Sequence, residues 1–290
     1  MIFSEFESIV NLFEKAKNFF SRRAHVKIPL NAGFHNTPAE LDEARVNNQI
    51  AKRIALSLEM ITDRDGKKFP NAWIGEYIGM EKPGDLEKII LGETEPTFQF
   101  LNHFAKCLGI DPSWLKSGQG EPFKIEPEKF MLWENYFEEI KAMRPEKIFF
   151  LRRRTGEGEA IIVLKLSKLK YFILPRIYHI SDHVGGTGRR QIDGFCRLVE
   201  KLNTTFLGGI MCGIEVEKSE LFELYEGKTH PSKLERYSRQ YNHWWEDITD
   251  VMHEFPSSKY YEQLYGDAFI QAQRMVRFVR TGSLDLVKKG

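Results

Sequence analysis

The segment 185–190 combines residue types that could hold an anion. It consists of Gly185, Gly186, Thr187, Gly188, Arg189 and Arg190, and it precedes an apolar-striped stretch, 191–202, that predicts a helix. Backbone N–H groups of a glycine-rich turn and of a helix N-terminus attract phosphate or carboxylate, and the two arginines would add charge. The segment lacks the Lys-Ser/Thr ending of a P-loop. The alternative interpretation is a helix-capping loop with Thr187 as the N-cap.

More cations lie on a predicted β-hairpin, in which the apolar runs 148–151 and 160–164 flank Thr155-Gly156-Glu157-Gly158. Strand alternation sends Arg152 and Arg154 to one face and Arg153 to the other. Three lysines also belong to the proposed hairpin: Lys165, Lys168 and Lys170. We expect a charged, solvated sheet face. The alternative is a second surface for nucleic acid or for an anionic ligand.

The chain has no familiar catalytic or metal-binding motif. It contains no Gly-x-Ser-x-Gly and no His-Glu-x-x-His. His179 and His183 are four residues apart, but the surrounding pattern predicts a strand end and a loop, with no third ligand nearby. The three cysteines are too few for a disulfide framework, and we expect reduced thiols. We therefore expect no catalytic residue, no metal and no cofactor.

Residues 43–123 show a series of short amphipathic segments. Ile50, Ile54, Leu58 and Ile61 form an apolar stripe within a predicted helix at 43–61. A polar loop leads to a short helix, 71–79, that ends at a glycine. Further helices are predicted at 82–91, 97–108 and 111–115. Short helices separated by glycine-marked turns predict a compact all-helical unit.

The stretch from Gly109 to Pro122 carries a family resemblance. A helix ends at Leu108-Gly109, and a short Pro112-Ser113-Trp114-Leu115 helix follows and leaves through Gly118-Gln119-Gly120. This arrangement resembles the end of the helix-turn-helix domain in lambda-type phage repressors and their XRE-family relatives. The segment Ile74 to Gly79 is similar to the family pattern Leu-Ala-x-Leu-Leu-Gly. The resemblance covers about 80 residues.

The resemblance implies a DNA-binding role for named residues. Gly75 would be the small residue that lets the two helices of the motif cross closely, and Gly79 the turn glycine. The helix from Lys82 to Leu91 would take the recognition position in the major groove. Candidate DNA contacts are Asn71, Lys82, Lys88, Lys67 and Lys68. Such units usually bind as two-fold dimers on half-sites about one helical turn apart.

This segment departs from the family pattern in its charge. Asp85 and Glu87 lie where base-contacting side chains usually sit, although carboxylates could accept from a cytosine amine. Residues 43–123 hold ten basic and twelve acidic side chains, whereas residues 147–198 hold eleven basic and four acidic ones. Because phosphate contacts dominate affinity for nucleic acid, the basic later segment is a competing candidate for the DNA-binding surface.

These patterns divide the chain into three parts. We expect an amphipathic helix at 1–23 and a connector at 25–42 in the first part, residues 1–42. The second part, residues 43–127, is the predicted all-helical unit that resembles the XRE domain. Residues 128–290 predict an α+β domain with a linking helix at 124–146, a third strand at 170–180 and further strands at 204–217 and 221–225. Helices at 232–253 and 258–280 close the chain, and the apolar spacing in the last one indicates a core face.

Composition sets the broad class. The 290 residues are 42% hydrophobic and 29% charged, with a formal net charge of +1, as in ordinary globular proteins. Acidic residues interrupt the N-terminal apolar positions, and no run is long enough to cross a bilayer, so we expect a cytoplasmic protein without membrane contact.

Together these observations predict a DNA-binding transcriptional regulator, in the simplest case a repressor. It would bind double-stranded DNA as a homodimer, and its C-terminal domain would dimerise the chain or bind a small-molecule or protein effector. One alternative is a protein-interaction module or inhibitor whose helix-turn-helix does not contact DNA. Another is an enzyme or sensor that binds a phosphate-bearing ligand at 185–190.

Overall fold

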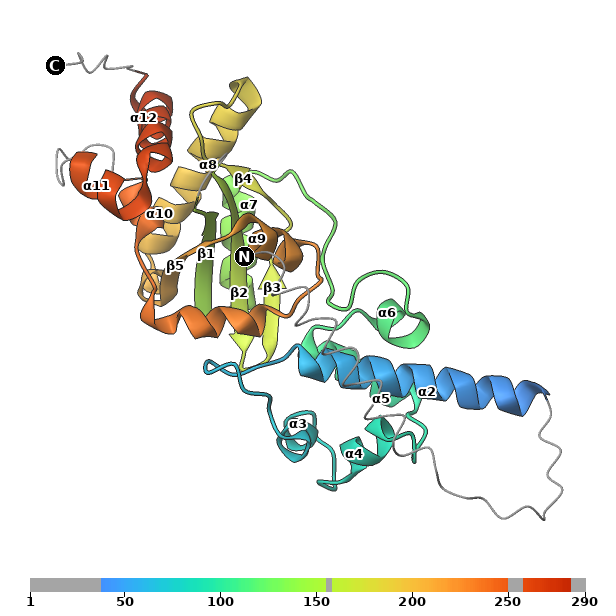
Figure 1. Cartoon of the computed structure of the whole chain (residues 1–290). Helices are drawn as coiled ribbons and strands as arrows, with labels where there is room; N and C mark the ends of the chain where they lie inside the picture. Colours follow the sequence, from blue (N-terminus) through green and yellow to red (C-terminus); the bar gives the residue numbers. More distant parts are fainter. Residues whose placement is uncertain (1–37, 155–157, 250–257, 283–290) are drawn as a thin grey trace, which may run out of the picture. The chain divides into compact units, whose positions relative to one another are not determined.

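A computed structural model describes residues 38–154, 158–249 and 258–282 of the chain. The chain divides into two compact units, Met1–Glu43 and Ala44–Gly290. The described residues have mixed helix and sheet content with one mixed sheet (Figure 1). The helix predicted at 1–23 and most of the predicted connector lie outside the described residues. Residues 38–42 are helical, so the connector prediction was wrong there.

The first part of the described chain, from Pro38 to Ser117, forms five helices, and we call it the helical region. These are α2 (Pro38–Glu59), α3 (Asn71–Tyr77), α4 (Asp85–Ile90), α5 (Phe98–Leu108) and α6 (Pro112–Ser117). Local chemistry sets their ends. The Thr97 hydroxyl accepts from the Phe100 N–H at the start of α5, and the Asp111 carboxylate accepts from the first N–H groups of α6. Gly109 and Gly118 end these two helices with positive φ.

The rest of the described chain, from Trp133 onward, is built on five strands, and we call it the sheet region. The strands are β1 (Lys147–Arg153), β2 (Glu159–Ser167), β3 (Lys170–Ile173), β4 (Tyr178–His179) and β5 (Met211–Val216). The order is β3-β2-β1-β5, and β4 pairs with the start of β2. The predicted hairpin is confirmed, because β1 and β2 are antiparallel. β5 lies parallel to β1 on its other side.

Helices cover both faces of the sheet (Figure 1). They are α7 (Trp133–Met143), α8 (Gly186–Asn203), α9 (Lys218–Tyr225), α10 (Trp244–Asp247), α11 (Ser258–Tyr265) and α12 (Asp267–Thr281), with the 3-10 helices η1 (Phe206–Ile210) and η2 (Pro231–Arg239). Because strand side chains alternate, Ile148 and Phe150 of β1 pack with α7, α8 and α12, whereas Phe149 and Leu151 pack with α9 and η2.

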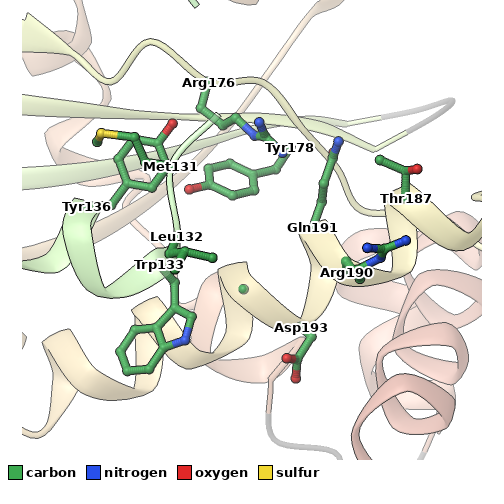
Figure 2. A pocket seen from close by; sticks show the side chains of 11 residues that line it. Met131, Leu132, Trp133, Tyr136, Arg176, Tyr178, Thr187, Arg190, Gln191 and Asp193 are labelled. Atoms are coloured by element: carbon green, nitrogen blue, oxygen red, sulfur yellow. The ribbon is translucent and has the colours of Figure 1, made fainter. Parts of the chain in front are cut away.

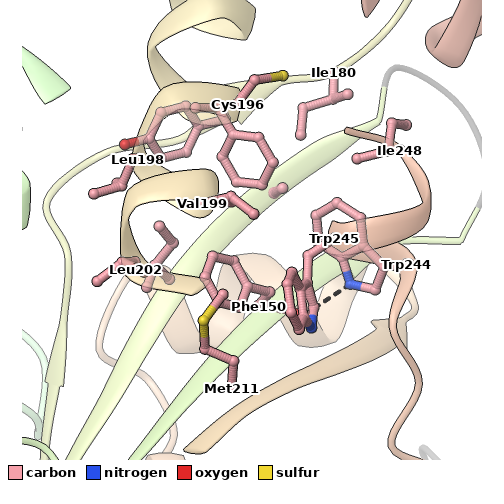
Figure 3. Packing of buried hydrophobic residues seen from close by; sticks show 14 of the residues in the cluster. Phe150, Ile180, Cys196, Leu198, Val199, Leu202, Met211, Trp244, Trp245 and Ile248 are labelled. Atoms are coloured by element: carbon pink, nitrogen blue, oxygen red, sulfur yellow. Dashed lines mark hydrogen bonds between the residues drawn. The ribbon is translucent and has the colours of Figure 1, made fainter. Parts of the chain in front are cut away.

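The larger core lies on the α8 side of the sheet. Trp244 is fully buried there, and its indole N–H donates to the Phe150 carbonyl at 2.9 Å (Figure 3). The apolar stripe predicted for the last helix is confirmed as a core face, since Phe269, Ala272 and Val276 are buried in the same cluster. The helices on this side are therefore held by apolar burial and by one directed hydrogen bond.

Several predicted elements were too long or of the wrong type. The linking helix is α7 alone, because Pro127 lies within the predicted span and the Lys129 N–H donates to the Pro175 carbonyl instead. Pro175 also divides the predicted third strand into β3 and β4. Residues 221–225 form part of helix α9, not a strand, and the strand at 204–217 shortens to β5. The two closing helices break, the second at Gly266, whose φ is +83°.

The expectation of a solvated, charged sheet face was wrong for Arg152. It is 1% exposed and lies 3.1 Å from the Glu215 carboxylate, with its guanidinium 4.7 Å from the Phe269 ring. Burial lowers the pKa of Arg152 to about 10, against the attraction of Glu215. The prediction failed because β1 is a central strand covered on both faces, where alternation does not lead to solvent.

The helical and sheet regions meet at the turn between β2 and β3. Leu169 of that turn is fully buried within the core of the helical region. Beside it, the Tyr77 hydroxyl is 2.9 Å from the Ser167 hydroxyl, and the Lys168 ammonium lies 4.2 Å from the Trp73 ring centre. The turn therefore joins the sheet to α3 through an apolar anchor and two polar contacts.

His230, just before η2, completes this junction. It is 1% exposed and its ring lies 4.9 Å from that of Phe123 and 5.5 Å from that of Tyr171. Its Nδ1 accepts from the Ser232 N–H at 3.1 Å. Burial lowers the pKa of His230 to about 4, while hydrogen bonds with the backbone at Leu108 and Leu169 act in the opposite direction. The ring is therefore neutral at pH 7.

We expect Leu169→Ala to lower the free energy of unfolding by roughly 2–5 kcal/mol, because it leaves a cavity in a closed core. Urea denaturation of the full chain measures this change. Leu264→Ala, at a leucine that is 50% exposed, is the matched control and should change stability by less than about 0.5 kcal/mol. Equal effects for the two variants would contradict the anchoring role of Leu169.

We also expect His230 to make stability depend on pH. Its folded-state pKa lies below the ordinary 6.5, so the unfolded chain takes up the proton first, and stability falls as pH drops from 6.5 to about 4. The slope should reach up to about 1.4 kcal/mol per pH unit relative to His230→Gln. Denaturation at pH 7.5, 6 and 5 measures it. The control variant His183→Gln, at an exposed histidine, should show the same change of unfolding free energy with pH as the wild type.

Candidate functional site

The segment α3 to α4 forms a helix, a glycine turn and a second helix. α3 buries Ile74 and Gly75 and ends at Tyr77, and Gly79 follows with a φ of +78°. The Met80 N–H donates to the Gly75 carbonyl at 2.8 Å and closes the turn. α4 then buries Leu86 and Ile89 in the same core. The two helices thus pack through their apolar sides and leave polar side chains outward.

The helix predicted from Lys82 to Leu91 is shorter in the structure. α4 contains six residues, and Gly84 stands at its N-cap without a side-chain hydrogen bond. Pro83 disfavours helical conformation at the residue before it, so Lys82 lies in the turn and not in the helix. Lys82 therefore precedes α4, whereas Lys88 lies within its last turn, and both are exposed.

The remaining candidate DNA contacts lie just before and at the start of α3. Asn71 is the first residue of α3 and is half-buried, whereas Lys67 and Lys68 are exposed in the preceding loop. A bridge between Thr62 and Lys68 closes that loop, and the Asp63 carboxylate accepts from the Lys67 N–H at 2.9 Å. All five candidates thus belong to the segment from the loop through α4.

Carboxylates accompany two of these lysines. The Lys68 ammonium is ion-paired with Glu59, and the Lys88 ammonium lies 3.8 Å from the Asp85 carboxylate. Glu87 is exposed on the same helix. The positive potential of this face is therefore modest, and Lys67 and Lys82 are the lysines with the least local compensation among the residues described here.

The glycine- and arginine-rich segment forms the first turn of α8. α8 begins at Gly186, with Gly185 as its N-cap and no side-chain capping hydrogen bond, so the interpretation of Thr187 as the N-cap was wrong. A Cβ at Gly188 would come 2.5 Å from the Val184 Cβ, which explains the glycine there. Arg189 places its guanidinium 5.0 Å from the Phe278 ring. The six residues therefore do not act together as one loop.

Thr187 and Arg190 instead line a cavity of about 370 Å³ beside α8 (Figure 2). Its other lining residues come from the segment before α7, from α7, from the strand β4 neighbourhood and from α8: Met131, Leu132, Trp133, Tyr136, Arg176, Tyr178, Gln191, Asp193 and Gly194. Arg176 is 8% exposed, and its Nη1 is buried without a hydrogen-bond partner in the described structure. Sequence reasoning missed Arg176, although a lone arginine after Pro175 in an apolar stretch was a usable signal.

The lysines of the predicted hairpin do not form one exposed basic face. Lys165 lies 2.8 Å from the Glu235 carboxylate, which Lys147 also approaches at 3.3 Å. Lys168 faces the Trp73 ring, and Arg153 pairs with Glu159 at 2.9 Å. These cations have partners within the fold, although Lys168 is exposed, as is Arg154 beside Glu217.

No family model matches the chain, and neither the curated proteins nor the solved structures contain a protein to which it is detectably similar. Among the described helices, none has both the length and the apolar character that crossing a membrane requires. Any functional assignment of the α3–α4 segment or of the cavity beside α8 must therefore be argued from its geometry and chemistry.

Gly75 has more room than the sequence resemblance implies. A Cβ built there would lie 3.7 Å from the Met80 Sδ and 3.9 Å from the Leu86 Cβ, which is ordinary van der Waals contact. We therefore expect Gly75→Ala to raise the free energy of unfolding by about 0.5–1 kcal/mol, because alanine favours the helix. Gly79→Ala, at a φ of +78°, should instead be destabilising by about 1–2 kcal/mol. Thermal denaturation of both variants measures the pair. Destabilisation by Gly75→Ala would show that the two helices leave no space for a methyl group.

Proposed function

We propose that the chain is a sequence-specific DNA-binding transcriptional regulator, in the simplest case a repressor, that acts as a homodimer. The observation that carries this proposal is the exposed side of α4 at Glu87 and Lys88, together with the exposed turn 81–84 before it, which follows α3 across Gly79 within a group of five helices. A helix presented in this way can enter the major groove while the preceding helix crosses the DNA backbone. The resemblance of residues 74–79 and 109–122 to XRE-type domains supports the same function.

Each candidate contact has a defined chemical part in this proposal. Asn71, at the start of α3, and Lys67 in the loop would donate to phosphate oxygens and set the register. Lys82, in the turn before α4, and Lys88, in its last turn, would donate to phosphates or to guanine edges. Lys68 would first have to leave Glu59. The sheet region would dimerise the chain or bind an effector.

The acidic side chains of α4 favour a second candidate function. Asp85 and Glu87 repel phosphate unless they accept from cytosine amines. A helix-turn-helix unit with these residues on its exposed face could serve instead as a protein-interaction module or inhibitor that binds a basic partner. Selection of binding sites from a random pool of duplex DNA distinguishes the two functions directly.

We expect the wild-type chain to enrich a palindromic site from a random duplex-DNA pool at physiological salt. The double variant Lys82→Ala/Lys88→Ala, run in parallel, should bind the selected site at least tenfold more weakly, since each lost base contact costs about 1–3 kcal/mol. Sequencing of the pool and titration of the selected site measure the two results.

The matched control changes two exposed lysines away from α3 and α4, Lys141→Ala/Lys228→Ala, and should select the same site with unchanged affinity. Failure of the wild type to enrich any sequence would overturn the proposal. Retention of the selected site by the Lys82/Lys88 variant would overturn the assignment of α4 as the recognition helix.

A further inference from the structure

We propose that the cavity beside α8 binds a small organic anion, with a carboxylate or phosphate held by Arg176 and an aromatic or otherwise apolar body held by the surrounding rings. This proposal deepens the effector part of the proposed function and rests on it for its biological role. The binding chemistry itself uses none of the candidate DNA contacts.

Arg176 supplies the main reason to expect an anion. The Arg176 residue is 8% exposed, and its guanidinium lies 4.5 Å from the Phe130 ring centre and 6.0 Å from the Tyr178 ring centre. Its Nη1 is buried without a partner in the described part of the chain. A buried cation with an unused donor is costly unless a partner satisfies it. A carboxylate or phosphate matches the planar donor pattern of arginine.

The start of α8 adds further polar groups on the same cavity. Thr187 and Arg190 line it, and the first N–H groups of this 18-residue helix have no partner within the helix. The Gln191 Oε1 is buried and also unpartnered among the described residues, which provides a site for a ligand hydroxyl or amine. Asp193 also lines the cavity, but its carboxylate accepts from the Arg197 guanidinium at 2.8 Å.

The remaining walls favour a ligand with an apolar body. Trp133, Tyr136 and Met131 line the opposite side of the cavity (Figure 2). The Tyr136 hydroxyl donates to the Lys129 carbonyl, so Tyr136 offers its ring and not its donor. Leu132 of the lining is 71% exposed, and Phe130, whose ring contacts Arg176, is 77% exposed, which leaves apolar surface for a ligand to cover.

The size of the cavity limits the ligand to a small molecule. Its volume of about 370 Å³ lies at the low end of ordinary ligand sites and accommodates one ring system with an acidic group. A ligand of this class satisfies Arg176 and covers the apolar rim at the same time. Inorganic phosphate would satisfy the charge alone, and an uncharged aromatic molecule would contact the rings alone.

Calorimetric titration of the full chain with four probes tests this proposal. The probes are phenyl phosphate, phenylacetate, inorganic phosphate and benzyl alcohol. We expect phenyl phosphate and phenylacetate each to bind at least tenfold more tightly than inorganic phosphate and than benzyl alcohol. Quenching of tryptophan fluorescence by phenyl phosphate should disappear in Trp133→Phe, which places the bound ring in this cavity.

Three arginine variants distinguish the contributions to the site. Arg176→Gln should weaken binding of phenyl phosphate at least tenfold. Arg190→Gln, at an exposed position where substitutions usually change stability little, should weaken it severalfold. Arg189→Gln, which removes the adjacent cation of α8 outside the cavity, should change it by less than twofold. These matched changes separate a defined site from a general effect of charge at the helix end.

Binding of neither aromatic anion at millimolar concentration would overturn the proposal, as would equal binding to the Arg176→Gln and wild-type chains. Equal affinity for inorganic phosphate and phenyl phosphate would overturn the apolar part of it. The titrations contain no DNA, so failure to select a DNA site would leave them unaffected. Selection of DNA by an Arg176→Gln variant that no longer binds phenyl phosphate would show that the two sites are independent.

Discussion

The packing of Leu169 into the helical region is the contact on which the relation between helices and sheet depends. Leu169 lies in the turn between two strands that pair directly, so its position follows from the register of the sheet. The Phe123 N–H also donates to the Gly227 carbonyl at 3.0 Å, and the Thr62 N–H donates to the Ser232 hydroxyl. These contacts join residues on either side of the domain boundary that the sequence predicts between 127 and 128. They therefore fix α3 against the sheet, and α3 is not part of an independently moving domain. From Ala44 onward, the helical region belongs to the same compact unit as the sheet region.

The charge of a sequence segment is a poor guide to the charge of a surface in this protein. The basic stretch 147–198 loses much of its excess to internal pairs: Arg152 with Glu215, and Lys147 and Lys165 with Glu235. The partner carboxylates lie in β5 and η2, far away in the sequence. Counting charges within a window therefore overestimates the exposed positive potential. Arg176 differs from these cations because no carboxylate in the described structure approaches it within ion-pair distance, and this makes its burial informative.

The sequence predicted best where the signal is local. The helices predicted at 97–108 and 111–115 lie within two residues of α5 and α6, whose ends the Thr97 and Asp111 caps and the glycines Gly109 and Gly118 determine. Prediction failed where tertiary contacts override local preference. Leu221 and Leu224 fit a strand or a helix equally well, and their burial against β1 and β2 in α9 could not be deduced from spacing. The cavity that we propose binds an anion was predicted only in part, since Thr187 and Arg190 were candidates from the sequence but Arg176 reaches the same cavity from a segment that follows Pro175.

The modest charge of the α3–α4 face constrains how DNA binding could work. Each phosphate neutralised by lysine or arginine contributes roughly −0.9 to the slope of log affinity against log salt concentration. Together, such phosphate contacts supply most of the nonspecific affinity of a protein for DNA. With Lys68 and Lys88 beside carboxylates, one copy of this face offers few free cations. A single copy would therefore bind weakly and with a shallow salt dependence. Two copies on a palindromic site would approximately double the contact free energy while the second copy binds at high effective concentration. Under the proposed function, useful affinity at physiological salt thus requires the dimer, and base contacts from α4 must contribute more than phosphate attraction does.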